Sequence, residues 1–215
     1  MQCYHLPYMA GRAGADVVLA AKNIFGNRSH GRWQPVPIIW NNCGQIVIPG
    51  GRKNAGETDL QGAQREYFEE TGVDFRVAAV RAQMICIGEP VLKVFRPDPG
   101  GYCCAYQMVS TTSPLLATVN ANIAAGTPAD DELHDTGLAA GQHAVSLFGP
   151  PQLAGWRLTQ FNQLGPNDQA IAMQRMADPF DWFVRCVEHL VGEIHRPSKA
   201  STSTVSAAPG ELRYD

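Results

Sequence analysis

The acidic residues of this chain are concentrated in one short stretch. Six of its 20 acidic side chains fall between Glu57 and Asp74, and three of the six are Glu66, Glu69 and Glu70. On a helix, carboxylates three or four residues apart lie side by side and repel one another unless they are compensated. A hard divalent cation such as Mg²⁺ or Mn²⁺, bound through carboxylate oxygens, removes that repulsion. The pattern therefore predicts a metal-binding helix.

The flanking residues indicate how this helix is positioned. An apolar run at residues 45–48 predicts a buried strand that stops at the turn of residues 49–51. Thr58 or Asp59 can cap a helix that runs to about Thr71, where Gly72 suits a left-handed C-terminal cap. Residues at helical spacing are expected to face the core: Leu60, Ala63, Tyr67 and Thr71.

This strand, loop and helix resemble the signature of the Nudix hydrolases. The residues that match its spacing are Gly51, Glu57, Arg65, Glu66, Glu69, Glu70, Gly72 and Val73. Tyr67 departs from the pattern, since the family usually has an aliphatic residue there, and its buried hydroxyl would need a partner. The resemblance implies an α/β fold, a Nudix α/β/α sandwich with a mixed central sheet, to which C-terminal helices are added.

The resemblance also implies a metal site. Glu66, Glu69 and Glu70 would bind the catalytic Mg²⁺, for which Mn²⁺ could substitute. A backbone carbonyl of Gly50 or Gly51 would assist, because glycine lets the main chain come close to the ion. Glu66 and Glu69 are thus expected to be catalytic as well as metal-binding.

Further roles follow from the same resemblance. Arg65 would orient the carboxylates by ion pairing, and Glu57 would be structural, pairing toward this arginine. The general base is left open: it could be Glu66 in the signature segment Gly51–Val73, called the Nudix box, or an acid of the loop at residues 127–135. Within this loop, Glu132 is the favoured catalytic candidate, ahead of Asp131.

The resemblance implies hydrolysis of a nucleoside diphosphate linked to another moiety. Pro90 lies 17 positions after Val73, close to where a proline in some subfamilies indicates ADP-ribose, so we expect ADP-ribose or a nucleotide sugar. One alternative is a nucleotide-sensing or partner-binding module without useful hydrolysis. Another is hydrolysis of capped RNA ends, which the mildly acidic chain disfavours because nucleic acid binding relies on basic surfaces.

Composition restricts the broad class of protein. The chain is 45% hydrophobic and 17% charged, with a formal net charge of −3, which argues against wholly disordered or polyanion-coating proteins. No apolar run approaches the roughly 18 residues of a membrane helix, and no secretory signal opens the sequence. We expect a cytoplasmic protein with reduced cysteines, in which the neighbours Cys103 and Cys104 face opposite sides of a strand.

The rest of the chain predicts a core domain followed by helices. The first strand is expected at residues 15–21, and further strands are expected at 75–87, 91–95, 102–109 and 143–148. Residues 32–40 are expected to form an irregular or edge segment, and residues 114–125 a helix. The expected division is a Nudix hydrolase domain at 1–166, a helical extension packed on it at 167–195, and a disordered tail at 196–215. The extension carries an apolar stripe that must be buried, against the core or in a homodimer seam: Phe180, Phe183, Val184, Val187, Leu190, Val191 and Ile194.

Overall fold

A mixed seven-stranded sheet forms the centre of the fold in the computed structural model, which describes residues 1–11, 14–96, 100–178 and 181–194. Its strands are β1 (Gln2–Gly11), β2 (Gly14–Lys22), β5 (Ile46–Val47), β6 (Gly50–Arg52), β7 (Val91–Arg96), β8 (Tyr102–Val109) and β9 (Leu133–Ala140). The pairing of β1 with β8 is parallel, and the other pairings are antiparallel.

The strands β1 and β2 pair only where β1 ends and β2 begins. Their register runs from Gly11 opposite Gly14 to Tyr8 opposite Val17. Beyond that point β5 pairs with the far end of β2, and β6 pairs with the start of β1. The short segment that contains β5 and β6 therefore enters the opening between the two long strands, and this brings the glycines of β6 into the middle of the fold.

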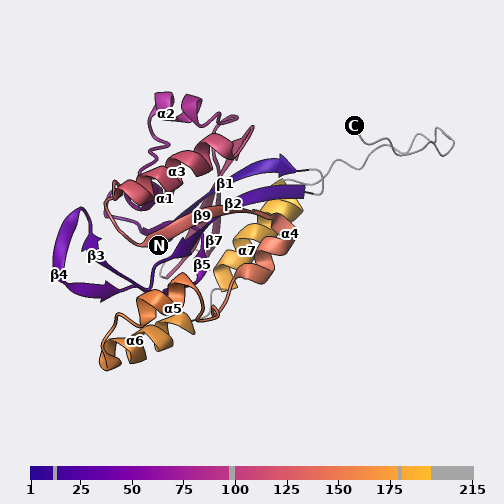
Figure 1. The fold of residues 1–215 in the computed structure, drawn as a ribbon. Helices are drawn as coiled ribbons and strands as arrows, with labels where there is room; N and C mark the ends of the chain where they lie inside the picture. Colours follow the sequence, from indigo (N-terminus) through magenta and orange to yellow (C-terminus); the bar gives the residue numbers. More distant parts are fainter. Residues whose placement is uncertain (12–13, 97–99, 179–180, 195–215) are drawn as a thin grey trace, which may run out of the picture.

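Helices cover both faces of this sheet (Figure 1). On one face lie α1 (Asp59–Thr71), α3 (Ser113–Ala125) and the short α2 (Ala78–Gln83), and on the other lie α4 (Gly141–Ala144) and α7 (Asp181–His189). Tyr67 and Phe75 are buried in the core on the α1 side, whereas Tyr4 and Phe183 are buried on the α7 side. The expected α/β sandwich with a mixed sheet and C-terminal helices is confirmed.

A third group of elements lies at one end of the sandwich (Figure 1). The hairpin of β3 (Phe25–Ser29) and β4 (Arg32–Ile39) extends outward, and α5 (Trp156–Phe161) and α6 (Pro166–Met176) pack at its base. The β4 strand pairs with β3, which fits the irregular or edge segment expected at residues 32–40, because Pro35 and Pro37 cannot donate backbone hydrogen bonds.

Three local predictions were wrong. The strand at residues 15–21 exists as β2, but β1 precedes it. Residues 75–87 contain the helix α2 instead of a strand, because its alanine-rich middle is exposed and only Phe75 and Met84 at its two sides are buried. Residues 143–148 form the end of α4 and a 3₁₀ turn (Val145–Leu147), and the expected last strand is β9, which pairs along most of β2.

The apolar stripe near the C-terminus packs against the sheet. Phe183, Val187 and Leu190 are buried in the same cluster as Tyr4 and Leu6 of β1. A π-helical turn (Leu190–Ile194) continues α7. This packing favours the core over a dimer seam, although the division of the chain at residues 166 and 195 stays a prediction. Phe180 and the tail predicted at residues 196–215 lie outside the described residues.

The two neighbouring cysteines of β8 face opposite sides of the sheet, as expected. Cys103 is buried with Cys3 and Ala63 on the α1 side, and Cys104 is buried with Cys186 on the α7 side. All six cysteines are free thiols. In the part of the chain that the structure describes, no helix has the length and apolar character needed to span a bilayer.

Candidate active site

The helix α1 is fixed at both ends by its own sequence. At its start the Thr58 hydroxyl accepts from the Gln61 N–H at 3.2 Å and the Gln61 side chain accepts from the Thr58 N–H at 2.9 Å, which is a capping box. At its end Gly72 adopts φ 73°, and its N–H donates to the Phe68 carbonyl at 2.8 Å. The predicted cap and end of the helix are thus confirmed.

The carboxylates of α1 open into one large cavity. Glu66 and Glu70 are buried, with 9% and 4% of their surface exposed, while Glu69 is half-buried. Together with Asp130 and Glu132 from the segment before β9, they line a cavity of about 910 Å³, which we call the acidic cavity. Five carboxylates in one partly enclosed space need positive charge close by.

Arg65 supplies part of that charge. Its guanidinium donates to Glu57 through Nε at 2.7 Å and to Glu69 through Nη1 at 2.8 Å, and Nη2 lies 2.9 Å from a carboxylate oxygen of Glu66. Nη2 also donates to the backbone carbonyl of Arg52 at 3.0 Å, which ties the helix to β6. Arg65 is therefore placed to orient the carboxylates, and Glu57 is placed to hold this arginine.

The two glycines of β6 lie in crowded positions, and Gly51 lies against Glu66. A Cβ atom at Gly51 would lie only 2.4 Å from Oε2 of Glu66, and one at Gly50 would lie 2.3 Å from the Cys3 carbonyl oxygen. No side chain would fit at Gly50, where the close atom belongs to the backbone, and at Gly51 the Glu66 carboxylate would have to move. The close approach brings the main chain of β6 beside the carboxylate and is compatible with the carbonyl ligand expected at Gly50 or Gly51.

Lys22 supplies a second positive charge, and it was not among the residues predicted from the sequence. It ends β2, lines the acidic cavity and forms an ion pair with Glu132 in which both side chains are 14% exposed. Burial alone would lower the pKa of Lys22, but Glu132 and Glu70 outweigh burial, so the pKa is raised. The pair holds the favoured loop acid inside the cavity.

The other residues of the loop have different surroundings. Asp131 accepts from the backbone N–H groups of Asn27 and Arg28 at 2.8 and 3.1 Å, so it supports the β3 strand. His134 stacks on Trp156 with ring centroids 4.0 Å apart. Glu132 therefore lies in the acidic cavity, whereas Asp131 and His134 do not line it.

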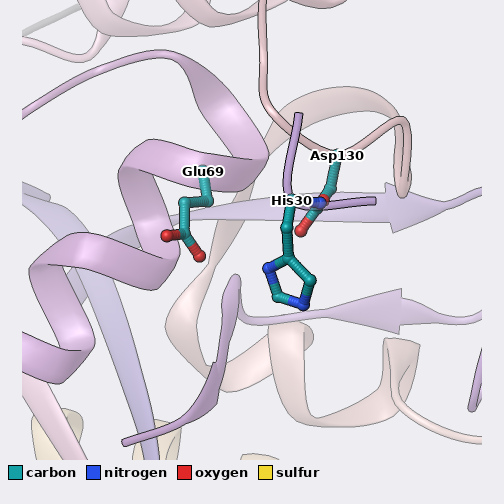
Figure 2. Close-up of side chains that lie close together, drawn as sticks. All are labelled: His30, Glu69 and Asp130. Carbon is teal, nitrogen blue, oxygen red and sulfur yellow. The ribbon is translucent and has the colours of Figure 1, made fainter. Parts of the chain in front are cut away.

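A second possible cation position lies at the edge of the acidic cavity. Ligand atoms of His30, Glu69 and Asp130 lie within 4.8 Å of one another (Figure 2). The Asp130 carboxylate also accepts from the His30 backbone N–H, and its own backbone N–H donates to the Glu69 carbonyl at 3.1 Å. His30 was not anticipated, because it becomes a neighbour of Glu69 only when the tip of the β3–β4 hairpin meets α1.

The buried acids hold their protons more tightly than carboxylates in water. Burial raises the pKa of Glu66 to about 7, although Arg65 opposes the shift. Burial, followed by the charge of Glu132, raises the pKa of Glu70 well above its ordinary range. Burial also raises the pKa of Asp130. A divalent cation would replace these protons, so the oxygen-rich donor set fits Mg²⁺ or Mn²⁺.

Comparison with known proteins agrees with this arrangement. Residues 9–100 match the family model of the NUDIX domain. Over these residues the chain carries a NUDIX domain. The matched residues include β6 and all of α1, which carry the Nudix box. A search of curated proteins finds no match.

Several solved structures are similar to this chain. A mutT/nudix family protein from Listeria innocua has 18% identity and a TM-score of 0.39, with 68% of this chain and 81% of that chain covered. The C. elegans Ap4A hydrolase in a binary complex has 12% identity and a TM-score of 0.39, covering 68% and 85%. The Nudix hydrolase RenU from M. smegmatis has 16% identity and a TM-score of 0.38, covering 81% and 82%.

Tyr67 of the Nudix box, which departs from the family pattern, lies fully in the core. It contacts the rings of His5 and Phe75, with centroids 5.1 and 5.3 Å away. Among the described residues, no hydrogen-bond partner is found for its hydroxyl. The partner expected from the sequence is thus absent from the described contacts, and the ring is held by packing.

Proposed function

We propose that this chain is a metal-dependent pyrophosphohydrolase that cleaves the diphosphate linkage of a small nucleoside diphosphate derivative. The observation that carries the proposal is the meeting of Glu66, Glu69 and Glu70 with the loop acid Glu132 in one cavity. Pro90 favours a substrate of the ADP-ribose or nucleotide-sugar type. A cavity of about 910 Å³ has room for such a molecule.

The carboxylates of the acidic cavity would bind the catalytic cation. Glu66, Glu69 and Glu70 would hold Mg²⁺, and the Gly50 or Gly51 carbonyl would complete the ligand set. When bound, the cation neutralises the diphosphate and lowers the pKa of a coordinated water. Its charge also lets carboxylates and an anionic substrate share one site.

An orienting arginine and a general base would complete the site. Arg65 keeps the carboxylates in register through its bonds to Glu57 and Glu69. The proton of the attacking water would pass to a carboxylate, and the two candidates are Glu66 in the box and Glu132, which is paired with Lys22.

A product-identified screen tests the proposal. The panel contains ADP-ribose, ADP-sugars, dinucleoside polyphosphates, NADH, coenzyme A, nucleoside triphosphates and capped RNA, each with Mg²⁺. We expect hydrolysis of a small nucleotide, and Glu69→Gln or Glu70→Gln should lower turnover by about 100-fold or more, because each removes a charge from the metal site. Glu188→Gln, on the exposed side of α7, is the matched control and should keep full turnover.

Three results would redirect the proposal. Unchanged turnover in both Glu69→Gln and Glu70→Gln would refute the metal site. Tight nucleotide binding with no product from any compound would favour a nucleotide-sensing module. Cleavage of capped RNA in preference to every small nucleotide would favour action on RNA ends.

A further inference from the structure

The lining of the acidic cavity is of two chemical kinds. One part carries the carboxylates, Lys22 and Arg65 described above. The other part is aromatic and lies outside the Nudix box; its side chains are Tyr4, Trp40, Trp182 and Phe183. Diphosphate and metal ions engage charged groups, so they leave this aromatic part without a ligand in the proposed reaction.

The helix α7 contributes two rings to the aromatic part. Phe183 is buried and meets Tyr4 edge to face, with centroids 5.0 Å apart. Trp182, the next residue, is only half-buried, and its ring centroid lies 6.1 Å from Phe183 and 6.3 Å from Tyr102. Neighbouring rings therefore support the Trp182 indole, while part of it stays open to the cavity.

The C-terminal helices also position the other tryptophan. Trp40 belongs to the loop after β4, whose backbone is bound by side-chain hydrogen bonds: Arg157 of α5 donates to the Gly44 carbonyl at 2.6 Å. In return, Gln45 of this loop donates to the carbonyls of Met176 and Asp178 at 2.8 and 2.9 Å. The loop is thus fastened to the end of α6 and to the residues that lead into α7.

We propose that the C-terminal helices form a nucleoside subsite in which Trp182 stacks on the aromatic base of the substrate. The inference rests on the proposed function, since it assigns the second part of the same cavity. A flat indole held by other rings loses little freedom when a base stacks on it, and every base has a face to offer. Asn41 and Gln2, exposed in the same lining, bring amide groups suited to a base edge.

The test compares two ligands that differ by a nucleoside. ADP and inorganic pyrophosphate are bound to the full chain in Mg²⁺, and affinities are measured by calorimetry. We expect wild type to bind ADP at least about tenfold more tightly than pyrophosphate, as base stacking predicts. Trp182→Ala should bind the two ligands alike, with pyrophosphate affinity unchanged, and Trp182→Phe should keep most of the preference. Trp33→Ala, at a ring that is 72% exposed and outside the cavity lining, is the matched control and should behave as wild type.

Two outcomes would overturn the inference: an ADP preference retained in Trp182→Ala, or an equal loss of ADP and pyrophosphate affinity. If Trp182→Ala does not fold, the quenching of tryptophan fluorescence by ADP is compared between wild type and Trp182→Phe. The quenching should be much smaller in Trp182→Phe, and equal quenching in the two proteins would refute stacking of the base on Trp182. Because binding is measured separately from hydrolysis, the two proposals can fail separately. Hydrolysis without any ADP preference defeats the subsite alone, and a Trp182-dependent ADP preference without hydrolysis defeats the proposed function alone.

Discussion

Removing the Lys22 charge should destabilise the protein far more than removing an ordinary surface lysine. In Lys22→Met a long unbranched side chain is kept, but Glu132 loses its positively charged partner while the Glu70 carboxylate remains nearby. Breaking a buried ion pair by deleting one member costs about 3–5 kcal/mol. Because both side chains of the pair are 14% exposed at the wall of a cavity, we expect the lower end of the range, about 3 kcal/mol at pH 8.

Urea unfolding followed by circular dichroism, in chelator and without metal, measures this loss. Lys53→Met is the matched control: Lys53 pairs with Asp59 at 2.6 Å, but the side chains are 25% and 22% exposed, so its loss should cost no more than about 1 kcal/mol. In Lys22→Met with Glu132→Gln, the unpaired carboxylate is gone and part of the stability should return. The difference between wild type and Lys22→Met should also narrow when Mn²⁺ is added, since the ion supplies positive charge to the same carboxylates.

The reasoning is refuted if Lys22→Met and Lys53→Met lose the same stability within error. It is also refuted if the double variant is no more stable than Lys22→Met alone. Either result would mean that the carboxylates around Lys22 are solvated well enough to need no partner.

Two further predictions concern the metal. Since the pKa of Glu66 is raised to about 7, a proton competes with the cation below that pH. Mn²⁺ affinity, measured by calorimetry, should therefore fall by up to about tenfold per pH unit between pH 7 and 5 and level off above pH 8. The affinity should depend less on pH in Glu66→Gln, and a flat profile in wild type would contradict the prediction. In Gly51→Ala the new methyl would lie 2.4 Å from the Glu66 carboxylate and should weaken Mn²⁺ binding by about 10-fold or more. Gly137→Ala, where no atom lies within 4 Å of the new methyl, is the control and should leave Mn²⁺ affinity unchanged. Equal affinities in the two variants would show that the Glu66 carboxylate can move aside without loss of metal binding.

The box helix could be predicted closely because its determinants are local. The Thr58 cap and the Gly72 end each depend on residues within one helical turn. The spacing of apolar residues along the helix indicates the buried face, on which Tyr67 lies. The strand β9 could not be predicted, since Asp135, Thr136 and Gly137 give it no strand pattern and its structure depends on pairing with β2. Propensity gave way there to tertiary context.

The same distinction applies to the candidate site. Glu66, Glu69 and Glu70 lie on one helix, so their spacing alone brings them together. Lys22 and Trp182 are far from them in sequence, and they become neighbours of the acidic cavity only through the sheet and the packing of α7. The one local signal for Lys22 is a charge that directly follows the apolar run of β2.

The parallel pairing of β1 with β8 has a consequence for how the chain folds. Gln2 to Met9 pair with Tyr102 to Val109, and α1 with its acidic residues lies between these segments in sequence. During synthesis, which proceeds from the N-terminus, β1 cannot pair fully with β8 until residue 109 has left the ribosome. Contacts between such distant segments slow folding. A chain interrupted before β8 would therefore carry a complete acidic helix without the strand that completes the sheet beneath it, and we expect such a fragment to aggregate before it can bind metal or nucleotide.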